Sequence, residues 1–240
     1  MVVKNQIKLI KSLQQKKCRI QHGLFVVEGI KTVQEISTSD FKAYKIYSTD
    51  LKLFDEGEVE VELISQAELK QMSGLKTPNT VLGVFYAPKL KELDFEDWIL
   101  VLDDIRDPGN LGTIIRLCDW FGIQHIVCSH NTVDCYNPKV LQATMGSIVR
   151  VNMVYADLDL FLKNVSTPVY GAYMDGVSIY NCKLPKKGIL ILGNEANGIS
   201  EEVEKTISQK ISILQSGSIT TESLNVATAA AILLNEVRRP

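Results

Sequence analysis

Three short stretches of this chain carry polar residues of the kinds that bind ligands or stabilise charge. The first is Asp107-Pro-Gly-Asn-Leu-Gly-Thr-Ile-Ile-Arg116, the second is Gly193-Asn-Glu-Ala-Asn-Gly198, and the third is Ser223-Leu-Asn225. An arginine can stabilise a developing negative charge, and a glycine lets a ligand approach the backbone closely. A carboxylate after a buried strand and two polar side chains in the first turn of a helix complete the set. These residue types suit a binding or catalytic site if the fold brings them together.

Each stretch also has a purely structural explanation. Arg116 lies opposite the apolar stripe of its predicted helix, where it can be a solvent-facing charge near Asp119. The turn that contains Glu195 can simply precede a helix, and Ser223 or Asn225 can be an N-cap. The residues by themselves leave these alternatives open.

The apolar segments around these stretches predict the elements that position them. We expect strands at residues 99–102, 126–128, 149–154, 169–173, 189–192 and 211–214, with helical patterns between most of them. Near-continuous apolar strands separated by helices indicate a mostly parallel sheet covered on both faces. Ligands bind beyond the carboxyl ends of strands in such sheets, so the loops after Leu102, Leu192 and Leu214 are expected to form a site.

The first half of the chain predicts a smaller α/β unit. Its strand and helix patterns end near residue 88, and the charged, proline-containing stretch 87–94 is the best linker candidate. We therefore predict two domains, at residues 1–90 and 97–240. The first 31 residues hold seven lysines and arginines against one glutamate, which indicates a phosphate-facing surface or, alternatively, a solvated helix face. This basic surface comprises Lys4, Lys8, Lys11, Lys16, Lys17, Arg19 and Lys31.

The composition argues against several classes of protein. The chain has 240 residues, 45% of them apolar, which is enough to bury a substantial core. No stretch is long and apolar enough to span a membrane, and the N-terminus lacks a signal-peptide core, so we expect a cytoplasmic protein. The five cysteines include no Cys-x-x-Cys pair and the three histidines form no ligand cluster, so we expect no metal site.

Taken together, the three stretches resemble the three motifs of the SpoU (TrmH-like) family, within the SPOUT class of S-adenosylmethionine-dependent RNA methyltransferases. The matching segments are residues 107–116, 192–198 and 222–226, in the order and at the separations of the family. Residues 137–146 and 19–29 also resemble segments of the family, so the resemblance covers nearly the whole chain.

The resemblance implies a fold and a cofactor. It implies a small N-terminal α/β substrate-binding domain followed by a SPOUT α/β domain with a C-terminal trefoil knot, in a protein that works as a homodimer. S-adenosyl-L-methionine is expected in the knot, held largely by backbone groups around Leu192, Gly193, Ile213 and Leu224. One departure is Leu214-Gln215, where members usually have a proline, followed here by a slightly longer segment.

The resemblance also implies a reaction, the 2′-O-methylation of a ribose in RNA, with large-subunit rRNA the preferred substrate. Arg116 is expected to stabilise the developing oxyanion, since a guanidinium with a pKa above about 12 is a poor proton acceptor. Asn110 and Glu195 are expected to orient Arg116 and the substrate. Ser223 and Asn225 are expected to hold the third stretch and the ribose in place. No metal is required, because the sulfonium of the cofactor already activates its methyl group.

Three alternatives remain open at the level of sequence. The substrate can be tRNA, or the chain can be a non-catalytic RNA-binding protein that keeps the fold. A nucleotide-dependent oxidoreductase is the third, although Gly109 and Gly112 lack the first glycine of the Gly-x-Gly-x-x-Gly fingerprint.

Overall fold

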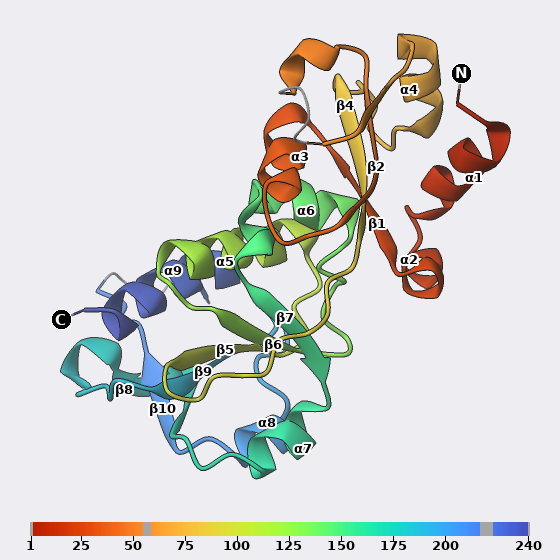
Figure 1. Ribbon diagram of the computed structural model, residues 1–240. Coiled ribbons are helices and arrows are strands. Elements are labelled where there is room, and N and C mark those ends of the chain that lie inside the picture. The colour runs from red at the N-terminus through yellow and green to blue at the C-terminus, as the bar shows by residue number, and fades with distance from the viewer. Residues whose placement is uncertain (1, 55–58, 217–222, 240) are drawn as a thin grey trace. The chain divides into compact units, whose positions relative to one another are not determined.

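The computed structural model of the chain describes residues 2–54, 59–216 and 223–239. The chain divides into two compact units, each formed by two stretches of sequence (Figure 1). The N-terminal unit comprises Met1–Lys89 and Asp134–Val149, and the C-terminal unit comprises Leu90–Val133 and Arg150–Pro240. The sequence-based division at residues 1–90 and 97–240 leaves the stretch 134–149 in the second domain, whereas its contacts group it with the first unit.

The N-terminal unit is built on a four-stranded sheet with the order β1-β4-β2-β3. β4 pairs antiparallel with β1 and with β2, and β3 pairs parallel with β2. Its strands are β1 (Leu24–Glu28), β2 (Ala43–Ser48), β3 (Val61–Leu63) and β4 (Val81–Tyr86). Its helices are α1 (Lys4–Ser12), α2 (Lys16–His22), α3 (Ile30–Ser37), α4 (Gln66–Met72) and α6 (Pro138–Thr144), with the 3₁₀ helices η1 (Leu51–Leu53) and η2 (Ser147–Val149). A buried cluster joins α1 and α4 to this sheet, because both helices present an apolar face.

A buried arginine ties α2 to the stretch 134–149. Arg19 is 5% exposed, and its Nε donates to Oδ2 of Asp134 at 2.9 Å. Its Nη1 donates to the carbonyl oxygens of Leu13 at 2.8 Å and Gln14 at 3.0 Å. The prediction that Arg19 belongs to an exposed basic surface is therefore wrong, since a guanidinium enters a protein interior only with such partners. The six lysines predicted with it are exposed.

Two further contacts hold the stretch 134–149 in the N-terminal unit. The ring of Tyr136 stacks on that of Phe25, with the centroids 4.6 Å apart. Gly146 has a φ of +96°, and a Cβ there would lie 2.6 Å from Cγ of Glu35. The turn after α6 therefore favours glycine for its backbone conformation and for the space it leaves.

The C-terminal unit is built on a six-stranded sheet with the order β10-β8-β9-β5-β6-β7, and every neighbouring pair is parallel. The predicted parallel α/β sheet is thus confirmed. Its strands are β5 (Trp98–Leu102), β6 (His125–Ser129), β7 (Asn152–Ala156), β8 (Val169–Ser178), β9 (Gly188–Leu192) and β10 (Gln209–Ser212). Its helices are α5 (Pro108–Trp120), α7 (Leu158–Lys163), α8 (Glu201–Glu204) and α9 (Val226–Val237), with the 3₁₀ helix η3 (Ile179–Asn181).

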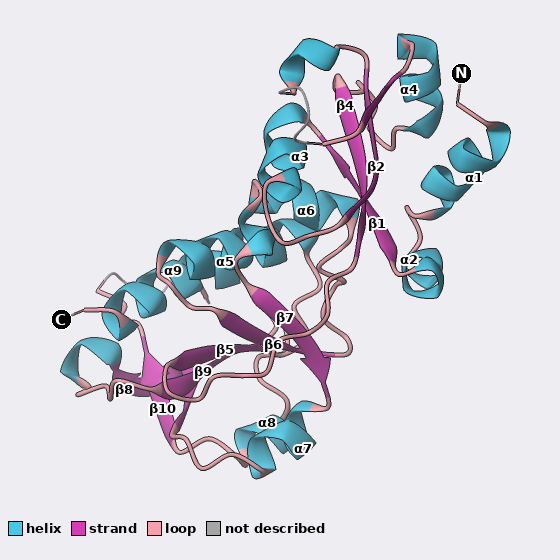
Figure 2. Cartoon of the chain, viewed as in Figure 1, coloured by secondary structure: helices cyan, strands magenta, loops and turns pink. Residues whose placement is uncertain are grey.

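The helices of the C-terminal unit cover both faces of its sheet. α5 packs against α9 on one face, and α7 contacts α8 on the other (Figure 2). Every residue of β5 and β9 is buried between these layers, as expected for central parallel strands. The strand predicted at 149–154 begins only at Asn152, because Ser147–Val149 forms η2. The trefoil knot implied by the resemblance stays a prediction.

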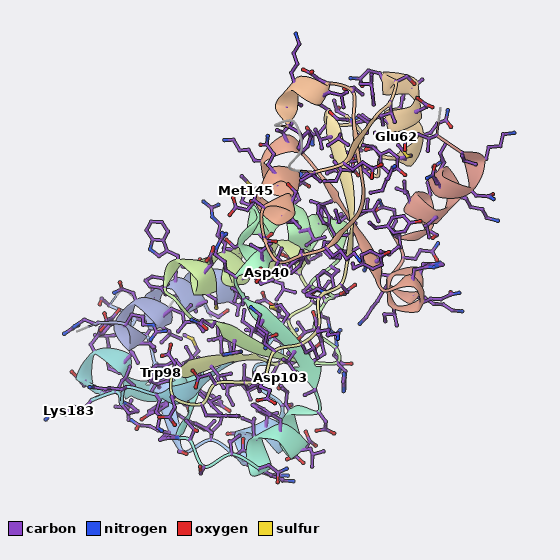
Figure 3. All side chains as sticks on the ribbon, in the orientation of Figure 1. Asp40, Glu62, Trp98, Asp103, Met145 and Lys183 are labelled. Atoms are coloured by element: carbon purple, nitrogen blue, oxygen red, sulfur yellow. The ribbon has the colours of Figure 1, made fainter. Side chains whose placement is uncertain are left out.

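The two ends of β5 carry side chains of different kinds. Trp98 at its start packs on Tyr170, with the ring centroids 5.5 Å apart, whereas the polar Asp103 follows its carboxyl end (Figure 3). Leu102 and Leu192 are register partners, so β5 and β9 end side by side. Within the described part of the chain, no helix is long and apolar enough to cross a membrane.

Candidate active site

The loop after β9 closes on itself. The backbones of Asn194 and Gly198 exchange two hydrogen bonds, of 3.0 and 2.9 Å, and Oδ1 of Asn194 accepts from the amides of Ala196 and Asn197. A Cβ on Gly193 would collide with the backbone of Gly198. The glycine is therefore required by the tight return of its own loop, whether or not a ligand also approaches it.

A buried carboxylate joins the loops that follow β5 and β9. Asp103 is 6% exposed, and its Oδ2 accepts from the backbone N of Ser200 at 2.8 Å and from its Oγ at 2.7 Å. The backbone N of Asp103 donates to the carbonyl of Leu192 at 2.9 Å. Ser200 is the N-cap residue of α8, but its hydroxyl donates to Asp103 and makes no cap hydrogen bond.

Side chains from all three predicted motifs form one hydrogen-bond network at the end of the sheet. Nδ2 of Asn110 donates to Oε1 of Glu195 at 2.5 Å, and Nδ2 of Asn225 donates to Oδ1 of Asn110 at 2.9 Å. Oδ1 of Asn225 also caps α9 by accepting from the amides of Ala227 and Thr228. Both ends of the Asn110 amide are engaged, which fixes its orientation. The segments near residues 110, 195 and 225 therefore meet, although 115 residues separate the first from the last.

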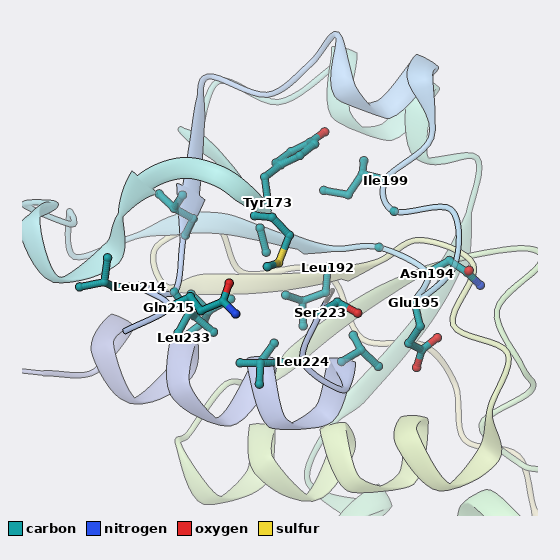
Figure 4. Close-up of a pocket in the computed structure, with 18 residues that line it drawn as sticks. Tyr173, Leu192, Asn194, Glu195, Ile199, Leu214, Gln215, Ser223, Leu224 and Leu233 are labelled. Carbon is teal, nitrogen blue, oxygen red and sulfur yellow. The ribbon is translucent and has the colours of Figure 1, made fainter. Parts of the chain in front are cut away.

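Through Glu195, the network borders a cavity of about 420 Å³, in which Glu195 is part of the lining (Figure 4). Loops after β9 and β10, the strand β8 and the first turns of α9 line it. Six predicted site residues are among its lining: Leu192, Gly193, Glu195, Ile213, Ser223 and Leu224. Glu222, the first residue of the third motif, lies outside the described residues.

The cavity has the size and lining of a small-molecule site, since such sites enclose about 300–1,000 Å³. Its wall is mainly aliphatic and includes the buried Ile211, Val226 and Leu233. Gln215 lines it at the segment where the SpoU resemblance departs. An aliphatic wall beside backbone groups of the Leu192–Gly193 loop suits the flat adenine ring and polar tail of a nucleoside-based cofactor.

Arg116 lies outside the lining of the cavity. It is exposed on α5, fewer than two helical turns and about 9 Å of helix rise beyond Asn110. Asp119, its expected neighbour, is instead engaged by Arg150, through two hydrogen bonds of 2.8 Å. Arg116 has no ion pair or hydrogen bond with any residue in the described part of the chain. Its guanidinium is thus available to a ligand or to another chain.

The wall that β8 contributes to the cavity is not predicted by the sequence. Ala172, Tyr173 and Met174 line the cavity, and the Tyr173 hydroxyl is buried with no hydrogen-bond partner among the described residues. Nζ of Lys210 lies 4.4 Å from the centroid of the Tyr173 ring. Burial raises the pKa of Tyr173, so the phenol stays protonated at neutral pH. No local pattern marks this wall, because it depends on β8 lying between β9 and β10.

Fold and cavity together define an α/β protein that binds a small molecule at the carboxyl ends of parallel strands. The model of the SpoU rRNA Methylase family matches residues 97–235, and the model of the MRM3-like substrate binding domain matches residues 4–83. The chain belongs to the SpoU rRNA methylase family.

Relatives of known sequence or structure match nearly the full chain. The 23S rRNA (guanosine(2553)-2′-O)-methyltransferase RlmP of Bacillus subtilis is 30% identical over 98% of this chain and 97% of its own. A solved structure of a TrmH-family protein from Porphyromonas gingivalis is 37% identical with a TM-score of 0.89, covering 99% of this chain and 98% of its own. The AdoMet-bound rRNA methyltransferase from Sinorhizobium meliloti is 25% identical with a TM-score of 0.86, and the match covers 99% of this chain and 95% of its own.

Proposed function

We propose that this protein transfers a methyl group from S-adenosyl-L-methionine to a ribose 2′-hydroxyl of large-subunit rRNA. The observation that carries the proposal is the network of Asn110, Glu195 and Asn225 at the edge of a small-molecule cavity. Such a network places polar groups from three segments where a second substrate can meet a bound cofactor. The similarity to RlmP over nearly both full chains supports rRNA as the substrate.

The cavity residues fit the cofactor. Leu192, Gly193, Ile213 and Leu224 line the cavity and would hold S-adenosyl-L-methionine largely through their backbone groups. When bound, the cofactor supplies a methyl group already activated by a sulfonium, so alignment and charge control are the tasks of the protein. The aliphatic wall would shield the bound cofactor from water.

The polar network would position the ribose. Glu195 accepts a hydrogen bond from Asn110 and keeps a second carboxylate oxygen for the substrate. Ser223 lines the same cavity and offers a hydroxyl. A ribose hydroxyl is almost fully protonated at neutral pH, so attack requires stabilisation of its developing negative charge. We assign that stabilisation to Arg116, although it lies outside the lining of the cavity, because its guanidinium is exposed on the helix that carries Asn110 and has no hydrogen bond or ion pair with the described residues.

We also propose that the protein acts as a homodimer. The exposed face of α5 carries Arg116 and, one turn later, Trp120, which is 84% exposed. Tryptophan and arginine are both enriched at protein interfaces. Size-exclusion chromatography with light scattering measures the mass of the assembly, and a Trp120→Glu variant should shift it toward a single chain.

Two measurements test the proposed activity. Calorimetry should detect binding of S-adenosyl-L-methionine, and labelled methyl groups should pass to an unmodified 23S rRNA transcript but not to total tRNA. Mapping 2′-O-methyl groups in RNA from cells with and without the protein should then reveal the target nucleotide. Absence of cofactor binding would contradict the proposed methyl transfer and favour a non-catalytic RNA-binding protein. Methyl transfer to tRNA alone would contradict rRNA as the substrate.

A further inference from the structure

The first three residues of the loop between β5 and α5 are held through their backbone amides. The backbone N of Asp103 donates to Leu192, that of Asp104 to Oγ of Ser129 at 2.8 Å, and that of Ile105 to Oγ1 of Thr132 at 3.2 Å. Ile105 is fully buried and its carbonyl accepts from the amide of Val133 at 2.9 Å. Arg106 is the first residue of the loop whose side chain projects into solvent, at 68% exposure.

Asp104 adopts an unusual conformation that three neighbours maintain. Its φ is +59°, in the left-handed region that a non-glycine residue enters only at a cost. Its carbonyl accepts from Nδ2 of Asn194 at 2.8 Å, and its amide is held by Ser129. Its carboxylate Oδ1 accepts from Nε of Arg106 at 2.7 Å. The strained residue thus links the cavity loop, through Asn194, to the guanidinium of Arg106.

The hydrogen bond to Asp104 leaves most of the Arg106 guanidinium unused. Only Nε is engaged, and neither terminal nitrogen has a partner within the described part of the chain. Two terminal nitrogens in a fixed plane match two oxygens of a phosphate. The Nε contact already orients the side chain, so binding a phosphate would cost little further side-chain conformational entropy.

The position of Arg106 relates it to the proposed reaction. It directly precedes Asp107, the N-cap of α5, and lies four residues before Asn110 of the site network. The acidic side chains of Asp107 and Glu195 at this end of the sheet would repel an RNA backbone without a cation to offset them. Arg106 supplies such a cation at the loop that Asn194 braces.

We propose that Arg106 binds a backbone phosphate of the RNA close to the ribose that is methylated, with Asp104 as the positioning residue that orients its guanidinium. The inference rests on the proposed function for the identity of the RNA. It assigns the loop before the first motif a role in holding the substrate, separate from the groups at the reacting atoms.

Substitution of Arg106 tests the phosphate contact. Arg106→Gln should weaken binding of an unmodified 23S rRNA transcript about tenfold, the effect of losing one charge-assisted contact. The slope of log Kd against log salt concentration should fall by roughly 0.7 to 0.9, as expected for one phosphate. KM for the transcript should rise by the same factor with kcat nearly unchanged, whereas calorimetric cofactor binding and the assembly mass should not change.

Two further variants separate charge from geometry. Arg239→Gln is the matched control, because Arg239 is also exposed and paired with one carboxylate, that of Glu236; it should leave affinity and slope unchanged. Arg106→Lys keeps the charge without the planar fork, so it should retain the slope and recover only part of the affinity.

Asp104→Asn tests the positioning role, since asparagine tolerates a positive φ. It should weaken RNA binding although it removes a negative charge, and it should have no further effect in the Arg106→Gln background. Tighter RNA binding by Asp104→Asn would overturn that role. Arg106→Gln behaving like Arg239→Gln, or changing the assembly mass, would overturn the phosphate contact. A protein that binds the transcript but methylates no RNA would refute the proposed function, while the binding arm still decides the role of Arg106.

Discussion

Arg19 in the N-terminal unit and Arg116 in the C-terminal unit both lie on helices, but their guanidinium groups have opposite surroundings. Arg19 is buried and bonds to Asp134 and to two backbone carbonyls. Arg116 is exposed, with no partner among the described residues. A buried charge whose donors are satisfied fixes the fold, whereas an exposed one with unused donors can serve a ligand. Both residues are arginines, so only the hydrogen-bond partners of each guanidinium distinguish the two roles.

The sheets of the two units also differ in what surrounds them. In the N-terminal unit a continuous apolar cluster joins α1 and α4 to the sheet. In the C-terminal unit the strand ends carry polar loops around a cavity of about 420 Å³. Parallel strands align their carboxyl ends at one edge, so loops distant in sequence gather there. The mixed sheet of the N-terminal unit does not gather its loops in this way.

The largest effect is expected from Arg116→Ala. Methyl transfer should fall by about 10³-fold or more, because the developing oxyanion loses its stabilising charge. Cofactor binding and the free energy of unfolding should stay near those of the unsubstituted protein, since the side chain is exposed and makes no hydrogen bond or ion pair with the described residues. Single-turnover kinetics and calorimetry measure the two quantities, with Arg239→Ala as the control. Normal turnover by Arg116→Ala would show that the exposed guanidinium of Arg116 has no role in methyl transfer.

Arg19→Met should act on stability instead. Removing one partner of a buried ion pair leaves Asp134 uncompensated and should lower the free energy of unfolding by about 3–5 kcal/mol. Urea denaturation followed by circular dichroism measures the change. The combined variant Arg19→Met with Asp134→Leu should recover much of it, because no unpaired charge then remains. A loss of RNA affinity without loss of stability would show that Arg19 contacts the substrate after all.

Lysines of the N-terminal helices should contribute to RNA affinity. Lys11, Lys16 and Lys17 are exposed, and replacing all three by glutamine should weaken RNA binding roughly ten- to a hundredfold. The salt slope should fall by up to about two, with kcat unchanged.

The matched control replaces three exposed lysines of the C-terminal unit, Lys163, Lys186 and Lys187, by glutamine. The net charge changes equally in both triple variants, so a difference between them locates the RNA surface. Equal losses of affinity would instead indicate a general effect of charge.

The smallest effect concerns pH. Burial lowers the pKa of His125, which lies at the start of β6 beside Asp94 and Asn152. The neutral imidazole is favoured in the fold, so its stabilising contribution is complete above the unfolded pKa of about 6.5 and is lost as pH falls below it. Stability should decline by about 1 kcal/mol or less between pH 7 and pH 5. His125→Gln should flatten this decline in urea titrations, whereas His22→Gln, at an exposed position, should not.

Much of the C-terminal unit could be predicted from sequence, because its strands are short apolar runs whose periodicity reflects burial. The N-cap of α9 also matches its residue, with Asn225 accepting from backbone amides, whereas the N-cap role of Asp107 at α5 was not predicted. Arg19 was misassigned because the partner that buries it, Asp134, is 115 residues away. The β8 wall of the cavity was missed for the same reason, since strand order is not a local property.

The amino-acid sequence by itself determined the alternation of strands and helices, the three motifs and the family they resemble, because each depends on residues close together in the chain. Tertiary structure alone decided which of the charged side chains are buried and paired within the fold. It buried Arg19, left Arg116 exposed and joined Asn110 to Glu195 and Asn225. The physical reason is that hydrogen bonding and desolvation depend on neighbours in space, and only the folded chain supplies them.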